Sequence, residues 1–158
     1  MEKTNALRAL DKAQIHYRLY SYESNGEALD ALSVAYAIQQ DPLKLYKTLI
    51  VRGSSKTHYV LIINAKDEID LKKSAAYLHE KSIALIPVND LLPLTGYVRG
   101  GCSPIGMKKS FTTVFDQTVL DQDSLIVSAG RIGLQMEIDR KTLVEFVKGK
   151  IGEISQKE

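Results

Sequence analysis

Hydrophobic and polar residues change their spacing several times along the chain, which predicts a succession of short helices and strands. Apolar residues at helical spacing follow Thr4, whose hydroxyl is suited to cap such a helix. Residues 15–22 (IHYRLYSY) instead alternate with the period of two that is typical of a strand. Helical spacing returns over residues 28–39, in an apolar stripe made of Leu29, Leu32, Ala35 and Tyr36. This helix is expected to end before Asp41-Pro42, because a proline disfavours a helical residue before it.

Two apolar segments in the middle of the chain predict a β-hairpin. Residues 46–52 (YKTLIVR) and 58–64 (HYVLIIN) flank a polar turn, GSSKT, at residues 53–57. Both segments are rich in leucine and β-branched residues, which favour buried positions in a sheet. We therefore expect two central, well-buried strands.

Aspartates mark the starts of two further helices. Asp70 is expected to cap a helix that reaches Leu78, and Asp139 a helix over residues 141–148. The buried side of the last helix is predicted to comprise Leu143, Phe146 and Val147. The remaining predicted elements are a strand at 82–88, a helical turn at 89–94 and three strands at 112–116, 125–128 and 134–138. The tail from Gly152 is expected to be frayed.

This order of elements predicts an α+β fold. Helices and strands mix without the strict alternation of a doubly wound fold, and several strands look hairpin-linked, which favours a mixed or antiparallel sheet. The 158 residues fit one domain, 1–158, and contain no repeat or internal linker.

Composition limits the classes of function. With 21 basic and 19 acidic residues, the chain carries a formal charge of +2, too little to indicate strong non-specific binding to nucleic acid. A single cysteine fits a reducing compartment. The first residues lack the apolar core of a signal peptide, and no apolar run is long enough to cross a bilayer. We therefore expect a cytoplasmic protein without membrane contact.

The segment GYVRGGCSPIGMKKS at residues 96–110 concentrates unusual chemistry, and three roles compete for it. Cys102 as a nucleophile would need a neighbouring base, which the sequence does not place beside it. A phosphate loop would need lysine directly after Gly106, where Met107 stands, and Pro104 removes an amide donor. The third role is a shaped backbone wall for a substrate. Metal-binding spacings are also missing, so we expect no metal and no cofactor.

Two further positions invite both a structural and a functional interpretation. Lys47 lies inside an apolar strand, where its charge must reach solvent, an ion partner or a cleft. It is either a lysine whose stem is buried and whose charge reaches water, or an ammonium that grips a phosphate or ester oxygen. Ser128, Ala129 and Gly130 are small residues at the end of a predicted strand. They indicate either an ordinary tight turn or a place where a ligand or another backbone approaches closely.

Taken together, LYKTLIV around Lys47, GYVRGGCSPIGMKK and VSAGRIGLQMEI resemble, in this order, the signature segments of the YbaK/EbsC family. The resemblance covers roughly residues 3–150 and includes the opening segment KTNALRALDKAQIHYRLYSYE. It implies free-standing editing proteins, typically Cys-tRNA(Pro) deacylases, related to the editing domain of bacterial prolyl-tRNA synthetases. It also implies a mixed, barrel-like sheet surrounded by helices, with a pocket for the aminoacyl 3′ end of tRNA.

Site residues follow from the resemblance position by position. Lys47 matches the family lysine that contacts the aminoacylated 3′ end, and we expect it to be the catalytic residue. The matching substrate-binding positions are Tyr22, Gly100, Gly101, Pro104, Ser128, Gly130 and Gln135. Prolyl-tRNA synthetase is the partner that the family suggests.

Two departures from the family pattern leave the amino acid open. Gln135 stands where several cysteine-specific members carry Asp, and Ser24 where some carry His. For Cys-tRNA, the family is believed to use the substrate's own thiol, which attacks its carbonyl and leaves as a cyclic thiolactone. An Ala-tRNA(Pro) hydrolase and a non-catalytic module that binds tRNA ends or a synthetase are the alternatives.

Overall fold

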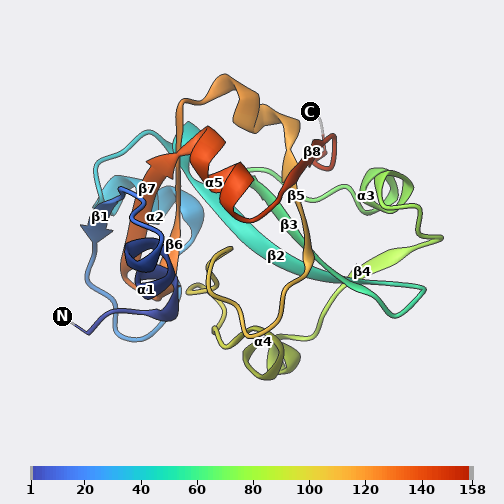
Figure 1. Cartoon of the computed structure of the whole chain (residues 1–158), viewed down its shortest axis with the longest axis horizontal. Helices are drawn as coiled ribbons and strands as arrows, with labels where there is room; N and C mark the ends of the chain where they lie inside the picture. The colour runs from blue at the N-terminus through green and yellow to red at the C-terminus, as the bar shows by residue number, and fades with distance from the viewer. Residues whose placement is uncertain (1, 157–158) are drawn as a thin grey trace.

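Two β-sheets with helices around them form the computed structural model, which describes residues 2–156 (Figure 1). The smaller sheet has the order β1 (Arg18–Ser21), β7 (Leu134–Asp139), β6 (Ser124–Arg131). The larger sheet has the order β4 (Ile83–Leu85), β2 (Tyr46–Gly53), β3 (His58–Asn64), β5 (Thr112–Asp116), β8 (Lys150–Gly152). A single bridge between Leu45 and Ile126 links them at the start of β2. The predicted α+β class is confirmed, with two sheets in place of one barrel-like sheet.

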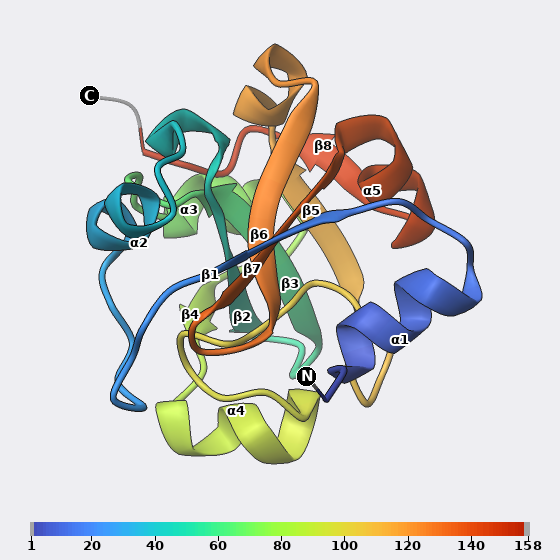
Figure 2. The same ribbon diagram turned by 90° about the vertical axis from the view of Figure 1, so that its left-hand side faces the viewer.

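Short helices surround both sheets, and four of the five begin with a capping side chain. The helices are α1 (Asn5–Lys12), α2 (Ala31–Ala37), α3 (Leu71–Tyr77), α4 (Val88–Thr95) and α5 (Arg140–Phe146), with 3₁₀ turns at Pro42–Lys44 and Gln117–Asp121. The capping residues are Thr4, Asp30, Asp70 and Asp139, so three predicted caps are confirmed. In Figure 2, α1 and α2 lie on opposite sides of β1.

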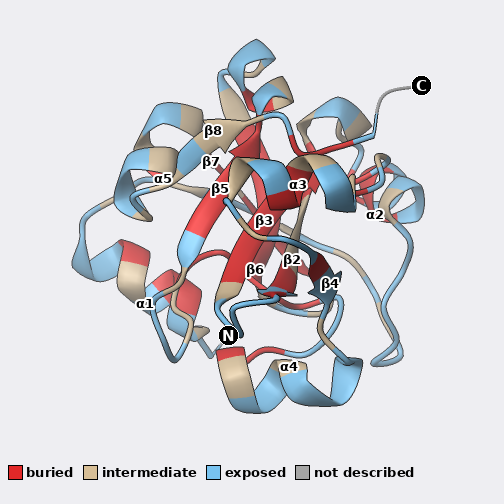
Figure 3. Cartoon of the chain, turned by 90° about the vertical axis from the view of Figure 1, so that its right-hand side faces the viewer, coloured by how far each residue is buried: buried red, intermediate tan, exposed pale blue. Residues whose placement is uncertain are grey.

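The predicted hairpin is confirmed and forms the centre of the larger sheet. β2 and β3 pair antiparallel from Tyr46 opposite Asn64 to Arg52 opposite His58. Each has a further strand on its other side, β4 beside β2 and β5 beside β3. The three inner strands of this sheet, β2, β3 and β5, are largely buried, whereas β4, β8 and the outer turns of the helices are more exposed (Figure 3).

Several predicted elements are shorter than expected, and one helix buries a different face. The strand expected at 15–22 is reduced to β1, and the strand at 82–88 to β4, because α4 already begins at Val88. Of the predicted apolar stripe, Ala35 is buried as expected, but the other three residues are exposed. Leu32 and Tyr36 are 60% and 88% exposed, because α2 begins only at Ala31 and packs Val34, Ala35 and Ile38 against Leu45, Ala65 and Ile126.

The C-terminal tail is packed from Gly152 to Gln156, which corrects the expectation of fraying for these residues; residues 157–158 lie outside the described part of the chain. β8 pairs in parallel with β5, and Ile154 is fully buried. The buried Asp116 carboxylate accepts hydrogen bonds from the N–H groups of Ile154 (3.0 Å) and Ser155 (3.1 Å). In α5, Leu143 is buried as predicted, but Phe146 is 39% exposed.

Glu80, which follows α3, fixes the turn of the central hairpin. Its carboxylate accepts hydrogen bonds from the Ser55 hydroxyl (2.6 Å), the Ser55 N–H (3.0 Å) and the Tyr59 hydroxyl (2.5 Å). These bonds, those from Ser55 first, lower the pKa of the Glu80 carboxyl to about 2. Glycine at position 53 leaves the space that this carboxylate fills.

Replacing Glu80 with glutamine is expected to remove a stabilisation that depends on pH. Because the folded pKa lies below the ordinary value of 4.5, the carboxylate stabilises the fold above about pH 4.5 and loses this effect as the pH falls towards about 2. Urea unfolding of both proteins should therefore show a difference in free energy of unfolding at neutral pH that shrinks through this range. A difference that stays constant from neutral to acidic pH would contradict the role of Glu80.

Candidate functional site

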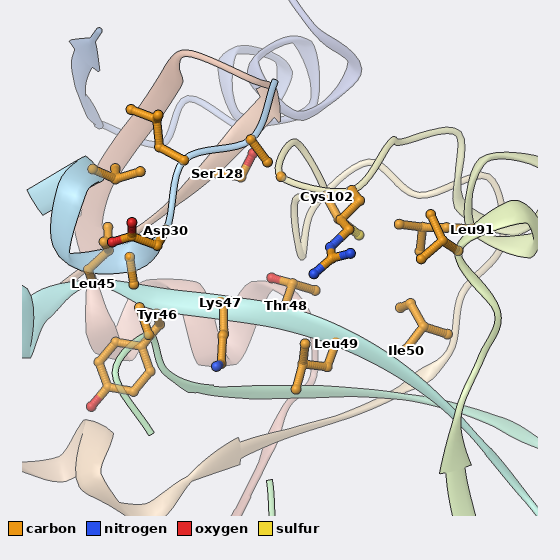
Figure 4. A pocket seen from close by; sticks show the side chains of 18 of the residues that line it. Asp30, Leu45, Tyr46, Lys47, Thr48, Leu49, Ile50, Leu91, Cys102 and Ser128 are labelled. Atoms are coloured by element: carbon orange, nitrogen blue, oxygen red, sulfur yellow. The ribbon is translucent and has the colours of Figure 1, made fainter. Parts of the chain in front are cut away.

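A cleft of about 960 Å³ lies where β2, the smaller sheet and two loops meet (Figure 4). β4 pairs only with Val51–Gly53 of β2, so among the described strands none covers the stretch 47–49 of this edge, which faces the cleft. Because this edge of β2 is uncovered, side chains from both faces of the strand reach the same cleft.

Lys47 lies beside this edge, on the same face of β2 as Leu45 and Val51. Leu45, just before β2, packs against α2, and Val51, near the end of β2, packs in the cluster that includes α3. It is half-buried, and its neighbour across the hairpin is the fully buried Ile63. No ion pair or side-chain hydrogen bond of Lys47 is found within residues 2–156. A half-buried ammonium in an apolar strand is costly without a partner. Figure 4 shows the Lys47 nitrogen on the side of β2 that faces away from Cys102 and Ser128, so its charge is available to an anionic or ester oxygen that lies across the open edge of β2.

Thr48 flanks the same edge on the opposite face and was not predicted as a site residue. Figure 4 shows it on the side of β2 that faces Cys102 and Ser128. Its hydroxyl oxygen is the one buried side-chain polar atom without a hydrogen-bond partner in the described part of the chain. Buried polar groups are normally paired, so an unpaired hydroxyl in a cleft suggests a ligand as its partner. The sequence gives no signal for this role, because a threonine in a strand can equally have its hydroxyl bonded within the protein.

The smaller sheet contributes three polar side chains to the cleft. Ser128 of β6 lies opposite Gln135 of β7, and a bulge follows Ser128. The Ser128 hydroxyl accepts a hydrogen bond from the N–H of Gly130 (3.2 Å). Tyr22 follows β1 and is held beside β7 by the hydrogen bond from its N–H to the Gly133 carbonyl (3.0 Å). Pairing between strands thus brings together residues that are up to 113 positions apart, from Tyr22 to Gln135.

The glycine pair closes the cleft by close backbone packing. Gly100 has a φ of +84°, and a Cβ there would lie 2.5 Å from the Cβ of Ala28. A Cβ on Gly101 would lie 2.8 Å from the Cα of Arg131, the last residue of β6. Glycine at both positions therefore lets the loop approach the segment before α2 and the end of β6 at once.

Five of the eight predicted site residues line the cleft, namely Tyr22, Lys47, Gly100, Ser128 and Gln135. The lining does not include Gly101, Pro104 or Gly130. Pro104 is buried, and a Cβ on Gly130 would lie 2.9 Å from the Cβ of Thr4, so that this glycine packs against the cap of α1. Ser24 also lies outside the lining, where its hydroxyl donates to the Glu27 carbonyl (2.7 Å).

Asn64 positions the start of β2 and was also missed. It is buried, and its amide nitrogen donates to the carbonyls of Pro42 (3.2 Å), Leu43 (3.0 Å) and Leu45 (3.2 Å). The two N–H groups of this amide are thus shared among three carbonyls of the segment that leads into Lys47. Buried asparagines bonded to backbone give no local sequence signal, because their partners depend on the tertiary fold.

The cleft carries positive charge and no activated nucleophile. Lys47 and Arg99 line it, together with Asp30, whose carboxylate is committed to Ser33 at the start of α2. No histidine is found among the described residues of its lining. Residues 2–156 likewise contain no cluster of three or more His, Cys, Asp or Glu side chains arranged for a metal ion. None of their helices is long and apolar enough to cross a membrane.

Cys102 lines the cleft but belongs to the hydrophobic core. Burial, only partly offset by a hydrogen bond with Thr95, raises the pKa of its thiol to about 12. Because the thiolate is the nucleophilic form of cysteine, this thiol is inert near neutral pH.

Substitution of Cys102 by alanine is therefore expected to leave catalysis nearly unchanged. The smaller side chain leaves a cavity that costs about 1–2 kcal/mol of stability, while kcat/KM for the reaction proposed below stays within about threefold. Urea unfolding and steady-state kinetics on the same preparation separate the two effects. A large loss of activity at unchanged stability would return Cys102 to the catalytic site.

Comparison with known proteins is consistent with this geometry. Residues 26–146 match the family model of the aminoacyl-tRNA editing domain. A protein of Enterococcus faecalis (strain ATCC 700802 / V583), named "Putative Cys-tRNA(Pro)/Cys-tRNA(Cys) deacylase EbsC", is 36% identical over 157 residues, 99% of this chain and 96% of that protein.

Two solved structures share the fold at low sequence identity. One, titled "Crystal structure of hypothetical protein APE2540", has a TM-score of 0.87 at 19% identity, over 97% of this chain and 100% of that chain. The other, titled "Crystal structure of a putative trans-editing enzyme for prolyl tRNA synthetase", has a TM-score of 0.85 at 16% identity, over 99% and 100%.

Proposed function

Because the chain belongs to the aminoacyl-tRNA editing domain family, we propose that it is a free-standing deacylase of mischarged Cys-tRNA(Pro). Cys-tRNA(Cys) is a further candidate substrate, as in the name of the E. faecalis relative. The observation that carries this proposal is the cleft, where family-matched residues from both sheets gather around the open edge of β2. It offers charge and hydrogen bonds but no activated protein nucleophile.

The absence of such a nucleophile points to a reaction assisted by the substrate. The cysteine thiol of the bound aminoacyl ester attacks its own carbonyl carbon, and the bond from this carbon to the ribose oxygen breaks. The thiol proton passes to the ribose oxygen, and cysteine leaves as a cyclic thiolactone with free tRNA as the second product. This reaction needs orientation and charge stabilisation more than a protein nucleophile.

Each cleft residue has a place in this scheme. Lys47 grips and orients the 3′ end through an anionic or ester oxygen, and Thr48 completes the hydrogen bonding of the aminoacyl group. Ser128 and Gln135 contact the substrate from the smaller sheet, while Gly100, held in place by the packing of Gly101 against β6, restricts the space beside it. A small cavity alone discriminates by a few kcal/mol per methylene at most, so the thiol requirement supplies the selectivity against proline.

A hydrolase of Ala-tRNA(Pro) is the second candidate, because Gln135 is neutral where several cysteine-specific relatives carry an aspartate. Gln135 is buried and lines the cleft, so its side chain bears directly on which amino acid fits. That enzyme would use water and release free alanine.

We propose that the protein acts in the cytoplasm, where tRNA is charged. We also propose prolyl-tRNA synthetase as its partner. A chain with a formal charge of only +2 gains little general affinity for tRNA. A synthetase that already holds tRNA(Pro) would supply the recognition that the small domain lacks.

The deacylation assay that tests the function compares Cys-tRNA(Pro), Cys-tRNA(Cys), Ala-tRNA(Pro) and Pro-tRNA(Pro). We expect release of tRNA from Cys-tRNA(Pro) and persistence of Pro-tRNA(Pro). Release from Ala-tRNA(Pro) alone, with free alanine, would establish the second candidate. Binding of mischarged tRNA without turnover would instead identify a non-catalytic module.

Replacing Thr48 with valine is expected to lower activity without lowering stability. The change removes an unpaired buried hydroxyl, so the free energy of unfolding should stay equal or rise by about 1 kcal/mol. Loss of one hydrogen bond to the substrate should lower kcat/KM about tenfold.

Thr113→Val is the matched control for Thr48→Val, because the buried Thr113 hydroxyl donates to the Phe111 carbonyl (3.1 Å) and lies outside the cleft lining. It should lose stability and keep activity. Full activity of Thr48→Val would remove the Thr48 hydroxyl from the site.

A further inference from the structure

A second groove, of about 870 Å³, adjoins the cleft and plays no part in the scheme above. It lies between α4 and the edge of the larger sheet formed by β4 and the tip of the β2–β3 hairpin; Figure 1 shows β4 and the hairpin tip at the right-hand end of the molecule and α4 at its lower side. The groove and the cleft share the wall made of Leu85, Ile86 and Pro87. A chain that leaves the cleft over this wall therefore enters the groove.

The groove collects basic side chains that form no ion pair within the described part of the chain. Its lining includes four of them, Arg52, Lys56, His58 and Lys109, against the single carboxylate of Asp90. The chain as a whole has nearly equal numbers of acidic and basic residues, so this is a local excess. The ion pairs found within residues 2–156 involve other lysines, and none neutralises these four.

The hairpin tip that carries much of this charge is held in place. Glu80 bonds the turn through Ser55 and Tyr59, so the nearest carboxylate to the turn is occupied by hydroxyl and N–H donors rather than by a cation. His58 packs edge-on against Phe111, with ring centroids 6.1 Å apart. The basic groups therefore extend from a fixed scaffold, as a preformed site for a charged ligand requires.

We propose that this groove, defined by Arg52, Lys56, His58 and Lys109, binds the phosphate backbone of the tRNA acceptor strand. This assignment rests on the proposed function, because the terminal nucleotide then occupies the cleft and the preceding nucleotides must leave across a shared wall. Phosphates contacted by lysine and arginine position a nucleic acid without reading its sequence. The groove would thus bind any acceptor strand, while selection of the amino acid stays in the cleft.

The test variant is the double substitution Lys56→Gln/Lys109→Gln, and its matched control is Lys12→Gln/Lys141→Gln. All four lysines are exposed, but Lys12 lies on α1 and Lys141 on α5, outside both the groove and the cleft. Each variant is assayed on full-length Cys-tRNA(Pro) and on 3′-O-cysteinyl-adenosine, which reaches only the cleft.

For full-length Cys-tRNA(Pro), the groove variant should lose roughly ten- to fiftyfold in kcat/KM near physiological salt, since each lost phosphate contact removes one released counterion. Its plot of log kcat/KM against log salt should become shallower by about 0.7 for each contact. Both variants should cleave 3′-O-cysteinyl-adenosine as the wild type does. An equal loss on both substrates, or an unchanged salt slope, would overturn the proposal.

A binding arm keeps the groove testable if the proposed function fails. Fluorescence anisotropy with uncharged tRNA(Pro) should show weaker binding by the groove variant alone, even if the wild type cleaves no ester. Polyglutamate serves as the competing acidic chain. Binding of polyglutamate that depends on Lys56 and Lys109, without such dependence for tRNA, would assign the groove to an acidic protein and overturn the proposal.

Discussion

Replacing Lys47 with methionine is expected to lower kcat/KM for Cys-tRNA(Pro) by about 100-fold or more. A preorganised positive group at a developing charge contributes about this much in other enzymes. Methionine keeps the apolar stem and removes the charge, and the half-buried ammonium has no protein partner in residues 2–156. Stability should therefore change by less than about 1 kcal/mol, so that kinetics and urea unfolding separate catalysis from folding.

Lys66→Met is the control for Lys47→Met. Lys66 is exposed, follows β3 and does not line the cleft, so its replacement should leave kcat/KM within about twofold of the wild type. Full activity of Lys47→Met would show that the reacting ester lies elsewhere.

Gly101→Ala is expected to remove nearly all activity because the added Cβ displaces the backbone beside the cleft. The new Cβ would lie 2.8 Å from the Cα of Arg131 and 2.9 Å from the N of Ile132, and this contact cannot be relieved by moving a side chain. The glycine loop and the β6–β7 turn must separate, which displaces Gly100 and the end of β6 beside Ser128. We expect a loss of about 1–3 kcal/mol in stability and of more than about 100-fold in kcat/KM.

Gly26→Ala is the matched glycine control. Its φ of +86° strains any side chain, but a Cβ there meets nothing within 4 Å. It should cost about 1 kcal/mol and leave activity within a few fold. Comparable activity of the two alanine variants would show that close packing at Gly101 does not shape the cleft.

Local signals in the sequence were sufficient for much of the fold. Capping side chains at Thr4, Asp70 and Asp139 located helix starts, because a cap bonds to an amide only two or three residues away. Alternating apolar residues around a polar turn located the β2–β3 hairpin. These features depend on neighbours in the chain, and the sequence displays such neighbours directly.

Features that depend on distant contacts could not be predicted in this way. The tail segment around Ile154 and Ser155 is packed because the Asp116 carboxylate accepts hydrogen bonds from amides 38 and 39 residues further along the chain. The exposed face of α2 was misassigned because the contacts of Leu45, Ala65 and Ile126 decide which side of a short helix is buried. Parallel pairing of β3 with β5 and of β5 with β8 likewise has no local signature.

In the site, too, residues within sequence motifs could be predicted, whereas residues whose role depends on distant contacts could not. Motifs pointed to Lys47 and to the glycine loop, and five of the eight positions line one cleft. Thr48 escaped notice because an unpaired hydroxyl is recognisable only when all of its surroundings are known. Gly130 and Pro104 also belong to recognisable motifs, yet a motif does not reveal whether a residue packs the scaffold or faces the cleft.

The most direct test of substrate-assisted editing compares Cys-tRNA(Pro) with Ser-tRNA(Pro) under single-turnover conditions with enzyme in excess. The two substrates differ by one atom, sulfur or oxygen, and only the thiol, with an ordinary pKa of about 8.5, supplies an appreciable nucleophilic fraction near neutral pH. We expect rapid release of tRNA from Cys-tRNA(Pro), with cysteine thiolactone as the first product, and persistence of Ser-tRNA(Pro). Equal release from both substrates, or persistence of Cys-tRNA(Pro), would contradict the proposed function.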